Sequence, residues 1–168
     1  MSGWSTAPAG PVGPGAGFAE ANDDGVPEIE PVAIKLLAMR EHSARELRDK
    51  LRSRFADHDA IAQVLADLQR RNLLSDERFT EQYVCMRSRK GYGPLRIRAE
   101  LVERGIDSTL IETALDMTPA EWVEKMREVA RQRFGDGQAA DRKEQARRAR
   151  FLNYRGFPES LVRSYLWD

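Results

Sequence analysis

The chain has 168 residues, 41% apolar and 32% charged, with a mean hydropathy of −0.60, which is enough for one domain or a short array of small units. No apolar run approaches the roughly 20 residues of a membrane span, and the Gly/Pro/Ala/Ser-rich start lacks the features of a secretory signal peptide. The single cysteine, Cys85, excludes an internal disulfide framework and is typical of a cytoplasmic protein.

The net charge of zero conceals an uneven distribution along the chain. Residues 1–31 contain five acidic side chains and no Lys or Arg. The remainder therefore holds 27 basic against 22 acidic residues, a net charge of about +5. Such a body is suited to approach phosphate groups or an acidic protein surface.

Residues 1–30 are predicted to form a disordered tail. They hold six of the 12 glycines and four of the 8 prolines and show neither helical nor alternating periodicity, so they bury too little apolar surface to offset the entropy of ordering. From Pro31 onward the pattern predicts nine helices in three units, at residues 31–74, 75–117 and 118–168. The predicted fold class is all-α.

In the first unit, the first helix is predicted to begin near Pro31. The second begins at a capping box formed by Ser43 and Glu46, and the third follows Asp57 or Asp59. Helical spacing predicts which side chains point inward. They are Ile34, Leu37 and Ala38 of the first helix, Leu47 and Leu51 of the second, and Ile61, Val64, Leu65 and Leu68 of the third.

In the second unit, Ser75 or Asp76 is predicted to cap the first helix. Pro94 is well placed as the first residue of the next helix, which Gly105 ends in a left-handed conformation. Asp107 caps a short third helix. The expected inward residues are Phe79, Tyr83 and Met86, then Ile97 and Leu101, then Leu110, Ile111, Ala114 and Leu115.

The third unit opens with a second capping box, Thr118 and Glu121, with proline at the first helical position. A basic helix runs from about Ala140 to Arg155, Gly156 ends it, and Pro158 opens the last helix. The expected inward residues are Trp122, Met126, Val129 and Phe134, then Leu161, Val162, Tyr165 and Leu166.

The three units align with one another as repeats. A shift of 51 residues places Leu101, Arg104, Gly105, Ile106, Leu110, Ile111 and Leu115 on Leu152, Arg155, Gly156, Phe157, Leu161, Val162 and Leu166. A shift of 50 places Leu47, Leu51, Arg54, Ile61 and Leu65 on Ile97, Leu101, Arg104, Ile111 and Leu115. A period near 50 residues with three helices per period predicts three tandem three-helix repeats in an elongated, curved array.

The sequence contains no catalytic constellation: no P-loop, no Cys or His pair at metal-ligand spacing and no nucleophile motif. We therefore expect no enzymatic activity, cofactor, metal or small-molecule substrate. His42 and His58 are expected to face solvent, and Cys85 is expected to be a partly buried, inert thiol.

Basic residues gather in three clusters. The first, on the second helix (Arg45, Arg48, Lys50, Arg52, Arg54), is best explained as a solvated face. The other two contain few acids and more arginine than lysine, and arginine makes two-point contacts with carboxylate and phosphate. From these we predict the partner-binding residues Arg87, Arg89, Lys90, Tyr92, Arg96, Arg98, Arg142, Lys143, Arg147, Arg148 and Arg150. Arg96 and Arg98 are expected to be exposed. Tyr92 and Tyr154 could stack on a base or a partner, or pack at helix ends.

Over residues 31–168 the chain resembles the RecX family of recombination regulators. The segments that carry the resemblance are residues 36–43 with Glu46, Leu47 and Leu51; residues 73–79 with Tyr83 and Val84; Arg87, Gly91, Gly93, Pro94, Arg96, Ile97, Glu100, Leu101, Gly105 and Ile106; and Phe151, Leu152, residues 155–157, Leu161 and Val162. The resemblance implies that the protein lodges in the groove of RecA filaments on single-stranded DNA. It also implies that the protein inhibits the ATP hydrolysis, strand exchange and co-protease activity of RecA and that it limits filament growth.

Two other functions remain open at this point. A direct nucleic-acid binder would use a helix-turn-helix pair such as 94–105 and 107–115, although the second helix of that pair contains no Lys or Arg. A scaffold for some other partner is the third reading. The sequence leaves open whether DNA is touched directly; we expect a monomer that makes no contact with a membrane.

Overall fold

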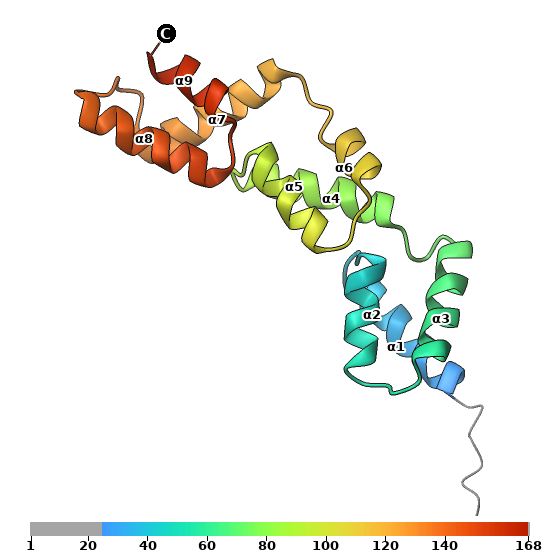
Figure 1. Cartoon of the computed structure of the whole chain (residues 1–168). Helices are drawn as coiled ribbons and strands as arrows, with labels where there is room; N and C mark the ends of the chain where they lie inside the picture. The colour runs from blue at the N-terminus through green and yellow to red at the C-terminus, as the bar shows by residue number, and fades with distance from the viewer. Residues whose placement is uncertain (1–24, 168) are drawn as a thin grey trace, which may run out of the picture.

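A computed structural model of the protein describes residues 25–167, and within this range the chain forms nine α-helices and no β-strand (Figure 1). They are α1 (Gly25–Met39), α2 (Ala44–Arg52), α3 (His58–Arg70), α4 (Asp76–Arg89), α5 (Pro94–Glu103), α6 (Ser108–Ala114), α7 (Pro119–Phe134), α8 (Arg142–Arg155) and α9 (Glu159–Trp167). The prediction of nine helices in an all-α fold is confirmed. Of the tail predicted over residues 1–30, residues 1–24 lie outside the described residues.

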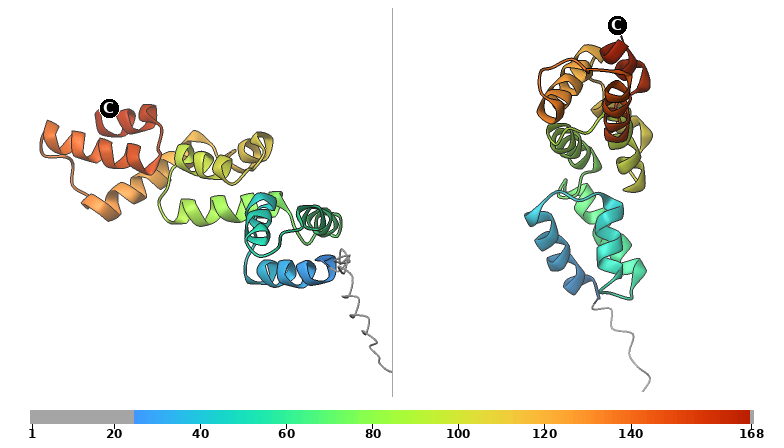
Figure 2. Two further views of the ribbon diagram at one scale, coloured as in Figure 1. Left: turned by 60° about the horizontal axis from the view of Figure 1, so that its bottom comes forward. Right: turned by 90° about the vertical axis from the view of Figure 1, so that its left-hand side faces the viewer.

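The helices pack in three consecutive groups, α1–α3, α4–α6 and α7–α9, and the main helix–helix contacts lie within each group. We call these groups units 1, 2 and 3. They follow one another end to end, so that α1 and α9 lie at opposite ends of an elongated molecule (Figures 1 and 2). No described helix is both long and apolar enough to cross a membrane.

Side-chain caps fix where most helices begin, as the sequence predicted. Asp57, Ser75 and Asp107 each accept hydrogen bonds from backbone amides of the following turn. Thr118 and Glu121 form the complete capping box. At Ser43 only half of the predicted box forms: the hydroxyl accepts from the Glu46 amide at 3.1 Å, but the Glu46 carboxylate instead pairs with arginines.

Corresponding positions of the three units are buried alike. Leu51, Leu101 and Leu152 lie on the middle helices α2, α5 and α8, and each is 0% exposed. These are the residues that the shifts of 50 and 51 superimpose. The repeat inferred from sequence is therefore a repeat of structure.

The apolar core is divided unequally among the units. One cluster, from Ile29 to Leu74, belongs to unit 1 alone. A second and larger cluster runs from Phe79 to Val162, so units 2 and 3 share it. Unit 1 is therefore attached to the rest mainly by polar contacts.

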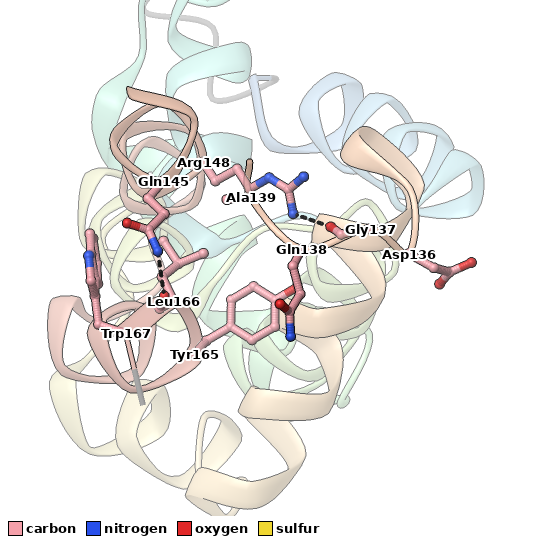
Figure 3. A pocket seen from close by; sticks show the side chains of 9 residues that line it. All are labelled: Asp136, Gly137, Gln138, Ala139, Gln145, Arg148, Tyr165, Leu166 and Trp167. Carbon is pink, nitrogen blue, oxygen red and sulfur yellow. Dashed lines mark hydrogen bonds between the residues drawn. The ribbon is translucent and has the colours of Figure 1, made fainter. Parts of the chain in front are cut away.

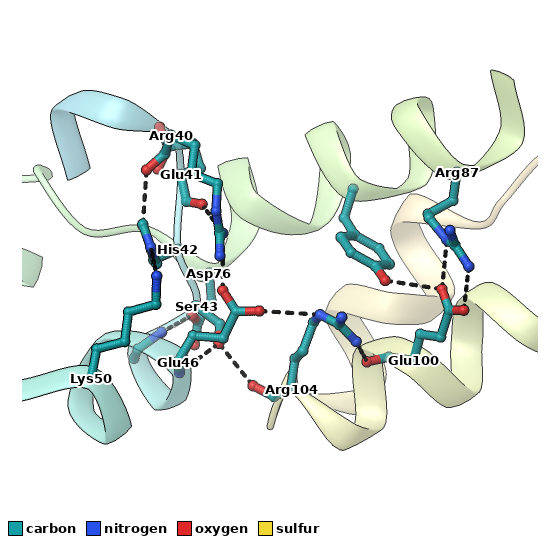
Figure 4. Close-up of polar contacts among 12 residues, drawn as sticks. Arg40, Glu41, His42, Ser43, Glu46, Lys50, Asp76, Arg87, Glu100 and Arg104 are labelled. Carbon is teal, nitrogen blue, oxygen red and sulfur yellow. Dashed lines mark hydrogen bonds and ion pairs between the residues drawn. The ribbon is translucent and has the colours of Figure 1, made fainter. Parts of the chain in front are cut away.

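The contacts between units 1 and 2 are shown in Figure 4. The Ser43 hydroxyl donates to the Arg104 carbonyl at 2.9 Å, and the Arg104 guanidinium lies 3.1 Å from the Glu46 carboxylate. The Asp76 carboxylate accepts from the Ala44 amide at 2.7 Å. At the next junction the corresponding bond is made by backbone alone, from the Gly93 amide to the Arg155 carbonyl at 2.8 Å. Both junctions thus join the end of one middle helix to the beginning of the preceding one.

The first helix differs from the prediction. It begins at Gly25, not near Pro31, and Pro31 lies inside it on the exposed side. Its buried residues are Ile29 and Ala33, whereas Ile34 is 39% exposed and Ala38, which was also expected to point inward, is exposed. The boundary at residue 30 was wrong because the proline and the flanking acids concealed Ile29, which packs into the core of unit 1.

Three further expectations about exposure were wrong. Cys85 is exposed, not partly buried, because it lies on the side of α4 away from Phe79. Met86, expected to point inward, is 40% exposed. His42, expected to face solvent, is 1% exposed, whereas His58 is exposed as predicted.

His42 is held by two hydrogen bonds that assign its tautomer. Its Nδ1 lies 2.9 Å from the Arg40 carbonyl and its Nε2 lies 3.0 Å from the Lys50 ammonium. The carbonyl can only accept and the ammonium can only donate, so the ring is neutral with the proton on Nδ1. Burial lowers the pKa of His42, and the charges of Arg40 and Lys50 act in the same direction, against the hydrogen bond to the Arg40 carbonyl and the charge of Glu46.

We predict that His42 makes stability depend on pH. Because its folded pKa lies below the unfolded value of about 6.5, the unfolded chain binds the proton more readily, and stability present above that pH is lost as the pH falls below it. The free energy of unfolding, measured with urea between about pH 8 and 5.5, should therefore depend on pH with a different slope in wild type and in His42→Gln. His58→Gln is the matched control and should keep the wild-type slope. An unchanged slope in His42→Gln would contradict the assignment.

Candidate functional site

The predicted partner-binding residues lie in two regions, around the junction of units 2 and 3 and on α8. They do not form one continuous set, because several of them stabilise the fold.

At the junction, three guanidinium groups surround the ring of Tyr92. The Cζ atoms of Arg87, Arg96 and Arg155 lie 3.6, 5.0 and 4.9 Å from its centroid, within cation–π range. Arg87 comes from α4, Arg96 from α5 and Arg155 from α8. Tyr92 therefore joins units 2 and 3, and its predicted role in stacking on a ligand is not supported by this packing.

Glu100 is the acidic centre of this region. It accepts from Arg87 Nε at 2.7 Å (Figure 4). It also accepts from Tyr83 Oη at 2.9 Å and from Arg96 Nε at 3.1 Å. Burial by itself would raise the pKa of Glu100, but these hydrogen bonds outweigh burial and hold the pKa below its ordinary value. Glu100 is therefore ionised at neutral pH, and Arg87 serves mainly to neutralise it.

Arg96 and Arg98 are less available than expected. Their side chains are 33% and 39% exposed, and each is paired with a carboxylate, Glu100 for Arg96 and Glu112 for Arg98. Arg96 also donates to the Tyr154 carbonyl at 3.3 Å. The expectation that both are freely exposed was wrong, because acids four or more residues away along the chain meet them in the fold.

Arg148 belongs to the interior of unit 3. It is 7% exposed and donates to the Gly137 carbonyl at 2.8 Å and to Glu144 at 3.1 Å. It borders a hollow of about 500 Å³ between the 136–139 loop and α9, where Gln145 donates to the Leu166 carbonyl (Figure 3). Arg148 therefore holds this loop against α8 and is not displayed on the surface.

A row of side chains on α8 has the exposure that the remaining prediction requires. Lys143, Arg147, Arg150 and Tyr154 are spaced by four, three and four residues, so they lie along one side of the helix. All four are exposed, and Tyr154 is 71% exposed. The row is about 16 Å long at 1.5 Å per residue. We call it the α8 stripe.

The charges of the α8 stripe are only partly neutralised. Arg147 pairs with Glu144 at 2.8 Å, and hydrogen bonds from Arg147 and Arg148 lower the pKa of Glu144. Lys143 and Arg150 have no carboxylate within 4.0 Å among residues 25–167, and the same holds for the exposed Arg89, Lys90 and Arg142. These five cations are the predicted residues that remain available to a partner.

Several residues that contribute to these regions were not among the predicted partner-binding residues. Arg104 and Arg155 occupy the same position of consecutive repeats, before Gly105 and Gly156, and both join units. Their coincidence under the 51-residue shift was a signal that they have a shared structural role. Tyr154 ends the α8 stripe, with its ring 5.1 Å from the Arg96 guanidinium.

Three three-helix units joined end to end, with a row of cations along one exposed helix, define a helical-repeat protein with a basic face. The sequence profiles of the first, second and third three-helix domains of RecX match residues 32–68, 75–115 and 120–166, in that order. The chain therefore belongs to the RecX family, a family of regulatory proteins.

Individual relatives agree with this assignment. The regulatory protein RecX of Pseudomonas syringae pv. tomato is 42% identical over 134 residues, which are 80% of this chain and 86% of the relative. That of Serratia proteamaculans is 38% identical over 158 residues, covering 81% of this chain and 94% of the relative. The crystal structure of RecX from Lactobacillus salivarius superimposes with a TM-score of 0.73 at 26% identity, over 84% of this chain and 94% of that one.

Proposed function

We propose that this protein binds RecA filaments on single-stranded DNA in the cytoplasm and inhibits RecA, lowering its ATPase, strand-exchange and co-protease activities without catalysing a reaction itself. The observation that supports this most strongly is the match to all three RecX domains over the same elongated body that displays the α8 stripe.

The shape favours a partner that is itself extended. Units 1 and 3 lie at opposite ends of the molecule (Figures 1 and 2), so each can meet a different subunit of a filament. Once one end is bound, contacts at the other become intramolecular and gain from the high effective concentration. A monomer is sufficient for this arrangement.

The alternative, a helix-turn-helix protein that binds DNA by itself, has weaker support. Its recognition helix would be α6, which contains no Lys or Arg, and Glu112 on this helix pairs with Arg98. A helix with a carboxylate and no cation of its own is poorly suited to a groove lined by phosphates. The α8 stripe is the better surface for an accessory contact with single-stranded DNA.

A protein that binds RecA filaments and a protein that binds DNA directly differ in what the full chain should bind. We expect it to co-sediment with RecA filaments on single-stranded DNA at concentrations where it does not bind the same DNA alone. A DNA-binding protein that makes 6–10 phosphate contacts should instead bind naked DNA, and lose roughly 10³–10⁵ in affinity between about 50 and 200 mM salt. Equal affinity for naked and RecA-coated DNA would overturn the proposal.

The α8 stripe is tested by reversing two of its charges. Lys143→Glu with Arg150→Glu should weaken filament binding by about tenfold or more and lower the salt slope by about 2. Both side chains are exposed and have no carboxylate partner in the described part of the chain, so the fold should be kept. Lys35→Glu with Arg163→Glu makes the same change of charge on exposed sites of α1 and α9 and should bind normally. Equal binding by both double variants would exclude the stripe.

A further inference from the structure

A hollow of about 720 Å³ lies on unit 2 where it meets the beginning of unit 3, between α4, α6 and α7. Its floor is apolar, and most of the side chains there are small: Val84, Cys85, Ala114, Met117 and Ala120. Small side chains leave room for larger apolar groups to pack against them. We call this hollow the α4/α7 groove.

The rim of the α4/α7 groove is acidic, in contrast to the basic body. Glu81 lies on the α4 side, and Glu121 and Glu124 lie on the α7 side. Lys125 is the basic residue among those that line the groove. The Glu121 carboxylate accepts from the Thr118 amide at 2.7 Å, which lowers its pKa and keeps it charged. Glu124 is 68% exposed, although it pairs with Arg127. Phosphate groups are therefore repelled from this rim, and a cationic ligand is attracted.

The groove and the arginines lie on different sides of α4. Glu81, Cys85 and Ser88 line the groove and are spaced by four and three residues, so they share one side of the helix. Arg87 is two residues from Cys85, about 200° around the helix, and it contacts Tyr92 and Glu100 of the junction. One ligand can therefore occupy the groove while another contacts the basic face.

The backbone of the occupant is also constrained. No sheet edge is available among the described residues, so an extended peptide in the groove would gain no ladder of backbone hydrogen bonds from the protein. A helix satisfies these groups internally and presents apolar side chains along one side, which fits a groove between helices.

We propose that the α4/α7 groove binds an amphipathic, basic helix of a RecA subunit, with apolar side chains on Val84 and Met117 and with Lys or Arg facing Glu81 and Glu124. This rests on the proposed function, which supplies the partner, and adds a second contact that is chemically opposite to the α8 stripe. Single-stranded DNA alone should not occupy the groove.

Cys85, the only cysteine of the chain, reports directly on the groove. N-ethylmaleimide should modify Cys85 of the free protein readily, because the thiol is exposed. In a complex with RecA filaments the rate should fall with the unoccupied fraction, roughly tenfold at about 90% occupancy. Single-stranded DNA without RecA should leave the rate unchanged.

A pair of charge variants tests the rim. Glu81→Lys with Glu124→Lys should raise the concentration needed for half-maximal inhibition of the RecA ATPase by about tenfold, because attraction becomes repulsion. Glu28→Lys with Asp59→Lys changes the net charge equally on exposed sites of unit 1 and should inhibit as wild type does. Circular dichroism melting checks that both variants fold.

The outcomes separate the groove from the proposed function. If the wild-type chain co-sediments with the filament but Cys85 reacts at the free rate, or if the rim and control variants inhibit equally, the groove is not the contact. Protection of Cys85 by DNA alone would also overturn the inference. If the wild-type chain neither binds nor inhibits RecA filaments, the proposed function fails and so does the partner named for the groove.

Discussion

Replacing Gly93 with alanine is expected to destabilise the protein strongly, although it adds only one methyl group. A Cβ at this position would lie 2.5 Å from the carbonyl carbon and oxygen of Gly156 and from the Phe157 nitrogen. These are backbone atoms, which cannot move aside as a flexible side chain can. We expect a loss of at least about 3 kcal/mol in the free energy of unfolding, the upper end of the cost of overpacking.

Gly137→Ala is the matched control for this prediction. A Cβ at Gly137 would meet no atom within 4 Å, so its stability should stay within about 0.5 kcal/mol of wild type. Urea unfolding followed by circular dichroism measures both variants. Equal stability of Gly93→Ala and Gly137→Ala would show that units 2 and 3 are not joined through this close backbone contact.

Leu101→Ala is expected to cost about 2–5 kcal/mol, the range for removing a buried leucine side chain. Leu101 is 0% exposed on α5 and belongs to the cluster shared by units 2 and 3. Its loss should therefore lower the melting temperature of both units together. The neighbouring Val102 is 56% exposed, and Val102→Ala should leave the melting temperature nearly unchanged.

The two leucine and valine variants also test the repeat itself. Equal melting temperatures of Leu101→Ala and Val102→Ala would contradict the conclusion that Leu101 is buried in the same way as Leu51 and Leu152. If only part of the transition shifted, with the portion from unit 1 unchanged, the division of the core into two clusters would be supported.

Local signals explain why most of the fold could be predicted. Side chains such as Asp57, Ser75 and Thr118 begin helices through bonds to the next turn, and glycine ends α8 because Gly156 adopts φ 91°. Each signal lies within a few residues of its effect. The period near 50 residues then extended the same reasoning to the whole array.

The start of α1 could not be predicted in this way. Asp23 and Asp24 precede Gly25 in the sequence, but they follow a Gly/Pro-rich segment, and Pro31 imitates a first helical residue. The helix extends further because Ile29 packs against α2 and α3 of unit 1, a contact that only the tertiary structure supplies. The burial of His42 has the same origin.

The candidate site was predictable as a region but not residue by residue. Sequence clustering singled out the basic segments, yet it could not show that Arg87 would neutralise Glu100 or that Arg148 would bind the Gly137 carbonyl. Those partners lie 11–13 residues away along the chain. The cations left for a ligand, such as Lys143 and Arg150, are those whose helical neighbours offer no acid in range.

The two junctions differ, so that units 2 and 3 are joined closely to each other whereas unit 1 is attached less extensively. Units 2 and 3 share an apolar core and the backbone contact at Gly93, whereas unit 1 is attached through Ser43, Glu46 and Arg104. Sequence similarity between the repeats did not reveal this difference, since the aligned leucines are equally buried in all three.

The most direct test of the central claim, that this helical array restrains a RecA filament, is a titration of the RecA ATPase on single-stranded DNA with the full chain. We expect inhibition well below one chain per RecA subunit, because a protein that limits filament growth acts on many subunits at once. An ATPase rate unchanged up to one chain per subunit would contradict the claim.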